Sequence, residues 1–247
     1  MALSLNERLI MLAVPSSYYY ARRIADEATW GEHELHSLDA IVQGGGTAID
    51  VGANQGFFAF AFSTIVDRVE AFEPNPDCAR FAQRMLGARA RVHEIALSNK
   101  TGTADFIVPV SKEGAVLHLG GKLMRADTQL SNNRRFNVQV RTLDSYKFEN
   151  VRAIKVDVEG SELQVLEGGQ ETISRFRPPL IVELLTGAYS DPVATTETIC
   201  EKFDYSPWLV TKGQEMVEAI PVLRSLGSNT TWRSPIRNRN VLFLARA

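Results

Sequence analysis

The 247-residue sequence has only two cysteines and four histidines, and these low numbers exclude several kinds of site. Cys78 and Cys200 lie far apart along the chain, so they form neither a disulfide framework nor a pair with the close spacing of metal ligands. Such sparse use of thiols is typical of a reducing compartment. We therefore expect a cytoplasmic protein without disulfides.

The sequence also lacks a strong excess of charge and a long apolar run. Its formal net charge of -2 disfavours general binding to nucleic acids or anionic membranes, because both depend on a positive field. No run approaches the roughly 20 apolar residues that span a bilayer. The stretch 9–14 is short and follows no basic cluster, so it indicates a helix rather than a signal peptide. We interpret four C-terminal arginines as a solvated rim, with a patch for an anionic ligand as the alternative: Arg224, Arg233, Arg237 and Arg239.

From residue 47 onward the sequence alternates between strand patterns and helix patterns. This alternation predicts an α/β domain with a mostly parallel sheet covered by helices on both faces. Residues 1–45 are predicted to form a helical N-terminal extension, and residues 46–247 the α/β domain. The last strand follows no long helix, so we expect it to be antiparallel. The predicted strands are 47–51, 68–72, 91–97, 103–110, 136–143, 152–158, 179–185, 205–210 and 240–246, and the predicted helices are 57–62, 76–86, 160–169 and 191–203.

The stretch AIDVGANQG places polar residues and glycines where the first predicted strand meets its helix. Ligands of open α/β sheets bind beyond the carboxyl ends of the strands, at the topological switch point. Gly52 allows the backbone to turn, and Gly56 allows a ligand or a helix to approach closely. Asp50 and Asn54 bring polar groups to the same strand end. A carboxylate there attracts a cationic group, which a dinucleotide pyrophosphate site would not favour.

A second acid, Glu73, ends the next predicted strand. It follows Gly52 by about 20 positions, which is the spacing of an acid that holds ribose hydroxyls. A carboxylate can accept hydrogen bonds from two adjacent hydroxyls. Pro74 stops the strand and leaves the acid in the loop, so the sequence predicts a ribose-binding group there.

The D-x-G-x-N-x-G motif and the second acid together resemble class I S-adenosylmethionine-dependent methyltransferases. Six segments, in their order, resemble the FkbM-type methyltransferase family: IDVGANQG, VEAFEPNP, EIALSNKTG, VRTLDSY, IKVDVEGSELQVLEGG and IVELL. The resemblance covers about residues 47–185, and DVEGSE is its most distinctive motif. It implies a Rossmann-like fold with a seven-stranded sheet, residues 46–247 as the methyltransferase domain, and S-adenosylmethionine as cofactor. The implied reaction is methyl transfer to a hydroxyl of a sugar, glycan or natural product.

The predicted cofactor site lies at the carboxyl ends of the first strands. Its residues are Asp50, Gly52, Asn54, Gly56, Glu73, Pro74, Ala96 and Leu97.

The candidate catalytic residues are Asp157 and Glu159, at the end of the predicted strand 152–158. Being two apart, they are expected on one face of that strand, where a carboxylate can take the proton of an acceptor hydroxyl. Other roles stay open: Asp157 could hold the cofactor's amino group or pair with Lys155, and Glu159 could cap the next helix. Glu183 could complete a carboxylate trio, but no close-spaced ligand signature supports a metal, and none is predicted.

Two other functions stay open. A nicotinamide-dependent oxidoreductase is disfavoured because Asn54 replaces the middle glycine of G-x-G-x-x-G and Asp50 precedes the loop. A catalytically inactive cofactor-binding module is disfavoured by intact motifs at several strand ends. The expected partner is a small-molecule or glycan hydroxyl acceptor. We interpret the histidines and the N-terminal aromatic residues as structural or solvated, with contact to the acceptor or a lid as the alternative: His33, His36, His93, His118, Tyr18, Tyr19, Tyr20 and Trp30.

Overall fold

The computed structural model of the protein describes residues 9–10, 12–110, 121–124, 133–184, 189, 191–226 and 239–246. The interpretations of His118, Arg233 and Arg237 lie outside these residues. Among the described helices, none has the length and the apolar character that crossing a membrane requires.

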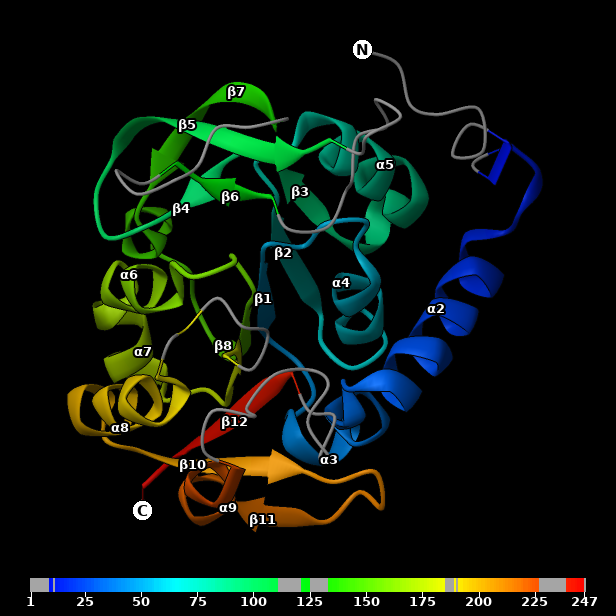
Figure 1. The fold of residues 1–247 in the computed structure, drawn as a ribbon. Coiled ribbons are helices and arrows are strands. Elements are labelled where there is room, and N and C mark those ends of the chain that lie inside the picture. The colour runs from blue at the N-terminus through cyan, green and yellow to red at the C-terminus, as the bar shows by residue number, and fades with distance from the viewer. Residues whose placement is uncertain are drawn as a thin grey trace.

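The described residues between 15 and 42 are mostly helical, as the sequence predicted. Their helical elements are α2 (Ser16–Trp30), the 3-10 helix η1 (His33–His36) and α3 (Leu38–Ile41). α2 runs along one side of the molecule beside α4 (Phe57–Phe62) (Figure 1). Tyr20 fixes this contact: it is fully buried, and its ring stacks on Phe60 with 4.7 Å between the ring centroids. The N-terminal segment is therefore packed on the α/β domain rather than separate from it.

An eight-stranded sheet forms the centre of the molecule, in the order β11-β10-β12-β9-β8-β1-β2-β3 (Figure 1). Five neighbouring strands, from β9 to β3, are parallel, and β12 is antiparallel to both of its neighbours. The mostly parallel sheet and the antiparallel last strand are thus confirmed. The strands are β1 (Thr47–Val51), β2 (Arg68–Phe72), β3 (Arg91–His93), β8 (Val151–Val156), β9 (Leu180–Glu183), β10 (Tyr205–Val210), β11 (Met216–Glu218) and β12 (Asn240–Ala245).

Two details of the predicted sheet are wrong. The sheet has an eighth strand, β11, a three-residue edge strand too short to carry an alternating pattern. The predicted strand 91–97 is two strands, because the chain leaves the main sheet after β3 and continues as β4 (Ala96–Leu97) in a second sheet. That sheet has the order β4-β7-β5-β6, with β5 (Gly102–Pro109), β6 (Lys122–Leu123) and β7 (Asn133–Arg141).

Helices cover both faces of the main sheet. α2, α4 and α5 (Pro76–Leu86) lie on one side, and α6 (Glu162–Glu167), α7 (Gln170–Phe176) and α8 (Pro192–Phe203) on the other (Figure 1). Each side has its own hydrophobic core, as expected for a parallel sheet buried on both faces. The start of α5 is as predicted, with the Asn75 side chain accepting a hydrogen bond from the Asp77 amide. A last helix, α9 (Ala219–Leu226), packs against α8 and β10.

The predicted helix 160–169 is shorter than expected and is followed directly by α7. Its two glycines are sites of close packing. A Cβ on Gly168 would lie 2.1 Å from the Ser98 carbonyl oxygen, and one on Gly169 would lie 2.6 Å from Leu143. Gly168 therefore lets the helices approach the loop after β4, and Gly169 lets them approach Leu143, which follows β7.

Candidate active site

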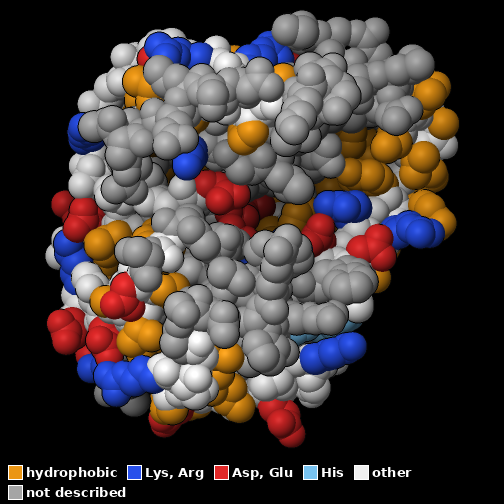
Figure 2. Space-filling view, in the orientation of Figure 1, with side chains coloured by type: hydrophobic (Ala, Val, Ile, Leu, Met, Phe, Trp, Pro, Cys, Tyr) orange, Lys and Arg blue, Asp and Glu red, His pale blue; other side chains and the backbone are white. Residues whose placement is uncertain are grey.

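A cavity of about 900 Å³ lies at the carboxyl ends of β1, β2, β8 and β9. Its volume is near the upper end of the range for small-molecule sites. Acidic side chains gather around a hollow at the centre of this face (Figure 2). The segments after the strands, helix α2 and the second sheet all contribute to its lining. A cavity thus lies where a ligand of an open α/β sheet is expected to bind.

Seven of the eight predicted cofactor residues line this cavity, and Gly56 does not. Gly56 has φ +86°, and a Cβ there would lie 2.9 Å from Leu86 Cδ1. It therefore serves the close approach of a helix, which was one of the two roles expected for it. The seven lining residues are Asp50, Gly52, Asn54, Glu73, Pro74, Ala96 and Leu97.

Gly52 brings two loops together. Its φ is +80°, its amide donates a hydrogen bond to the Phe72 carbonyl, and a Cβ there would lie 1.7 Å from the Asp157 carbonyl oxygen. The turn role is confirmed. The atom that excludes a side chain belongs to the backbone of the loop after β8, so this glycine sets where Asp157 lies.

Glu73 is held rigidly at the end of β2. It is buried, and its carboxylate accepts hydrogen bonds from the backbone amides of Asn54 and Asn75, each at 2.7 Å. Burial raises the pKa of this carboxyl to about 7, although the two amide donors oppose the shift. Each carboxylate oxygen has a second lone pair, so the group can still accept hydrogen bonds from a ligand.

Asp50 carries a buried oxygen without a partner. Only 2% of the residue is exposed, and Oδ2 accepts no hydrogen bond from the part of the chain that the structure describes. Burial raises the pKa of Asp50 to about 7, and Lys155 opposes this shift. Unpaired buried carboxylate oxygens are costly and rare, so this one indicates a ligand that brings a donor or a positive charge.

Lys155 lies among the acids of the cavity. It is 1% exposed, its Nζ lies 3.4 Å from Asp157 Oδ2, and the same atom lies 4.9 Å from the centroid of the Phe58 ring. Burial raises the pKa of Asp157, but the charge of Lys155 and the hydrogen bonds from Glu183 and Lys155 together hold that pKa below its usual range. Burial and the Asp157 charge raise the pKa of Glu183 well above its usual value, so Glu183 donates a hydrogen bond to Asp157. The pairing of Asp157 with Lys155 is thus confirmed.

The expectation that Asp157 and Glu159 share a strand face is wrong, because β8 ends at Val156. Both acids lie in the following loop and line the cavity, where Glu159 has φ +56°. Burial raises the pKa of Glu159 to about 7. The oxygens of these two acids and of Glu183 lie within 4.8 Å of one another, a spacing that could hold a cation. The Lys155 ammonium already supplies positive charge at this point.

Glu162, the first residue of α6, holds the loop that precedes this helix. Its carboxylate accepts hydrogen bonds from the amides of Val158 and Gly160 and from the Tyr189 hydroxyl. Glu162 is 1% exposed and does not line the cavity, whereas Glu159 does.

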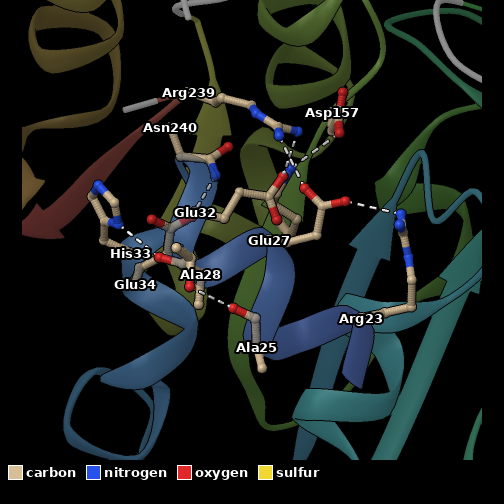
Figure 3. Close-up of polar contacts among 12 residues, drawn as sticks. Arg23, Ala25, Glu27, Ala28, Glu32, His33, Glu34, Asp157, Arg239 and Asn240 are labelled. Carbon is tan, nitrogen blue, oxygen red and sulfur yellow. Dashed lines mark hydrogen bonds and ion pairs between the residues drawn. The ribbon is translucent and has the colours of Figure 1, made fainter. Parts of the chain in front are cut away.

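Helix α2 and the turn before η1 contribute four lining residues: Tyr19, Arg23, Glu27 and Glu32. Tyr19 is one of the aromatic residues for which a lid was the alternative role, and sequence reasoning missed the other three. Arg23 and Glu27 are an i, i+4 pair, a pattern typical of a solvated helix, so it gave no signal of a site. The interpretation of Arg239 as a solvated rim residue is wrong. It lines the cavity and pairs with Glu27 at 2.9 Å and Glu32 at 3.4 Å (Figure 3).

Two histidines have structural partners, as interpreted. His33 Nδ1 lies 2.8 Å from the Ala28 carbonyl oxygen, and His93 Nε2 lies 2.7 Å from Glu70 Oε2. The His93 ring also stacks on Phe72 with 4.6 Å between centroids. Neither residue lines the cavity.

The chain is similar to known methyltransferases in sequence and in fold. Residues 50–225 match the model of the methyltransferase FkbM domain. A curated relative, 2-O-methyltransferase NoeI of Sinorhizobium fredii, is 30% identical over 145 residues, which cover 52% of this chain and 59% of the relative. The crystal structure of methyltransferase FkbM from Methylobacillus flagellatus aligns with a TM-score of 0.52 at 18% identity, covering 81% of this chain and 43% of that one. The chain thus spans about half the length of these relatives, and the structural match confirms the expected fold.

Proposed function

Because the chain belongs to the methyltransferase FkbM family, we propose that it transfers a methyl group from S-adenosylmethionine to a hydroxyl of a sugar, glycan or other natural product. The observation that carries this proposal is the pair of acids at adjacent strand ends. Glu73 is fixed by two backbone amides, and Asp50 keeps a buried oxygen without a partner. The relative named as a 2-O-methyltransferase supports a hydroxyl acceptor. The family match favours this reaction over nicotinamide-dependent oxidation.

The groups around the cavity fit this cofactor. Glu73 is placed to accept hydrogen bonds from two ribose hydroxyls, and Asp50 to meet a donor or a positive charge. The apolar part of the lining suits the adenine ring and includes Ile95, Ala96, Leu97 and Phe106. S-adenosylmethionine, when bound, supplies an electrophilic methyl group on a positively charged sulfur. Seven acids and three basic residues line the cavity, so the surroundings favour a cationic ligand.

Asp157 and Glu159 are the residues that we propose to face the acceptor. Asp157 is kept ionised by Lys155, so it can accept a hydrogen bond from the acceptor hydroxyl and align it. Glu159 has a pKa of about 7, which lies near the pH at which a general base is most effective, so it can take the hydroxyl proton. Glu159 is also partly exposed, so it can pass that proton on to water.

Calorimetry and a transfer assay test the proposal. We expect S-adenosylhomocysteine to bind the purified protein and NAD not to bind. We also expect radiolabel from methyl-labelled S-adenosylmethionine to appear on at least one member of a panel of glycosides and hydroxylated natural products. Binding of NAD without S-adenosylhomocysteine would overturn the proposal. Cofactor binding without transfer to any acceptor would favour an inactive cofactor-binding module.

A further inference from the structure

One wall of the cavity is built by the segment that precedes the sheet. Tyr19, Arg23 and Glu27 lie four residues apart on one face of α2, and Glu32 follows just before η1. Figure 3 shows Glu27 and Glu32 directed toward the Arg239 guanidinium, on the side where Asp157 lies. The wall therefore adjoins the acids proposed to face the acceptor.

The basic residues of this wall are already paired with carboxylates. Glu27 accepts hydrogen bonds from both Arg23 and Arg239, each at 2.9 Å. Arg239 also contacts Glu32, and Lys155 contacts Asp157. Within the described part of the lining, each basic side chain thus has an acidic partner. A phosphate or carboxylate on a ligand would therefore meet a carboxylate beside each of these basic groups, among seven lining acids.

Glu32 has the opposite property, because one of its oxygens lacks a partner. The residue is 1% exposed, and Oε2 accepts no hydrogen bond from the described residues. Burial raises the pKa of Glu32 to about 8. Lys155 and Arg239 oppose this shift, while Glu34 and Asp157 add to it. In either protonation state a carboxyl oxygen can accept a hydrogen bond, so this one is suited to a ligand that brings an O–H or N–H donor.

We propose that Glu27 and Glu32 determine which acceptors the cavity admits. Glu32 binds a hydroxyl or amino group of the acceptor. Glu27 pairs with both arginines and, with the other acids of the lining, repels acceptors that carry a phosphate or carboxylate. The acceptor class is therefore a neutral or cationic molecule rich in hydrogen-bond donors. This inference rests on the proposed function, since it concerns the acceptor side of the same cavity.

Ligand-observed NMR on the full-length protein saturated with S-adenosylhomocysteine tests the inference. The probes are methyl glucopyranoside, which is neutral, and its phosphate ester. We expect the wild-type protein to bind the neutral probe and not the ester. Glu32→Ala should weaken binding of the neutral probe about tenfold, which corresponds to the loss of one hydrogen bond. Glu27→Gln should leave Arg23 without an ionised partner and Arg239 paired with Glu32 alone, and it should strengthen binding of the ester at least about tenfold.

Glu34→Gln is the matched control. Glu34 is as buried as Glu32, is hydrogen-bonded to Asn240 and does not line the cavity, so probe binding should not change. Binding of the ester by the wild-type protein as tightly as the neutral probe would overturn the inference, and this comparison needs no variant to fold. The inference would also be overturned if the wild-type protein did not bind the neutral probe. The same holds if folded Glu32→Ala bound the neutral probe, and folded Glu27→Gln the ester, as the wild type does. If the wild-type protein did not bind S-adenosylhomocysteine, the proposed function itself would fail.

Discussion

Replacing Glu73 by Gln should weaken cofactor binding by an amount that follows from the hydrogen bonds of this residue. The carboxylate is fixed by two backbone amides at 2.7 Å and retains two lone pairs for a ribose diol. A side-chain amide has one acceptor oxygen, so at least one ribose hydroxyl loses its partner. A hydrogen bond to a charged group contributes about 1.5–3 kcal/mol. The dissociation constant of S-adenosylhomocysteine should therefore rise about 10- to 150-fold.

Calorimetric titration at about pH 8.5 is the assay, because the pKa of Glu73 is about 7 and the carboxylate is then ionised. At about pH 6 the wild-type carboxyl is largely protonated, so the difference between the two proteins should shrink. Glu70→Gln is the control: Glu70 lies on the same strand, contacts His93 and does not line the cavity. If the folded Gln variant of residue 73 binds within about twofold of the wild type at the higher pH, Glu73 does not hold the ribose.

Three further predictions concern the loops and acids around the cavity. Gly52→Ala should lower both the melting temperature and cofactor affinity, because its Cβ would meet the Asp157 carbonyl. The control is Gly87→Ala, at φ +59° in open space, which should cost about 1–2 kcal/mol of stability and leave cofactor affinity unchanged. If the Gly52→Ala and Gly87→Ala variants bind the cofactor equally tightly, this reasoning is wrong. Glu159→Gln should keep S-adenosylhomocysteine affinity but lose turnover about 10²- to 10⁴-fold, whereas full turnover would exclude Glu159 as the base. The free energy of unfolding of the apo protein should fall between about pH 6 and 8.5. Acids with raised pKa values stabilise the fold when protonated, and this contribution is lost as the pH rises through the folded pKa. Calorimetry that shows the free energy of unfolding rising over this range would refute the prediction. These acids, with pKa values of about 7 to 8, are Glu32, Asp50, Glu73 and Glu159.

The parts of the fold that depend on local pattern could be predicted from the sequence. β1 and β2 have the predicted bounds, and α5 begins with the predicted cap at Asn75, because apolar alternation and capping act over a few residues. The split of 91–97 could not be predicted. Its apolar pattern is the same whether the strand continues or passes to a second sheet, and that choice is made by pairing with β7.

In the candidate site, too, the residues that depend on local pattern could be predicted and those that depend on tertiary contacts could not. Asp50 and Glu73 could be predicted because each ends a strand and the strand ends meet at one edge of the sheet. Glu32 and Arg239 could not be predicted, because they meet only after the chain has folded and neither lies in a motif. Charged residues on a helix or beside a strand are usually solvated, and only tertiary packing makes these two part of a cavity.

The place of β12 in the sheet has a consequence for how the chain folds. β12 follows β10 in sequence but lies between β9 and β10, so β10 cannot dock in its final position until β12 has been made. Arg239 directly precedes β12 and pairs with Glu27, far away near the start of the chain. Closing so long a loop is entropically costly, so such contacts form late. On the ribosome, β1, β2 and β8 can therefore assemble while the wall formed by α2 still lacks its C-terminal partner. A nascent chain would acquire the half of the cavity that we propose for the cofactor first, and the residues that we propose to select the acceptor last.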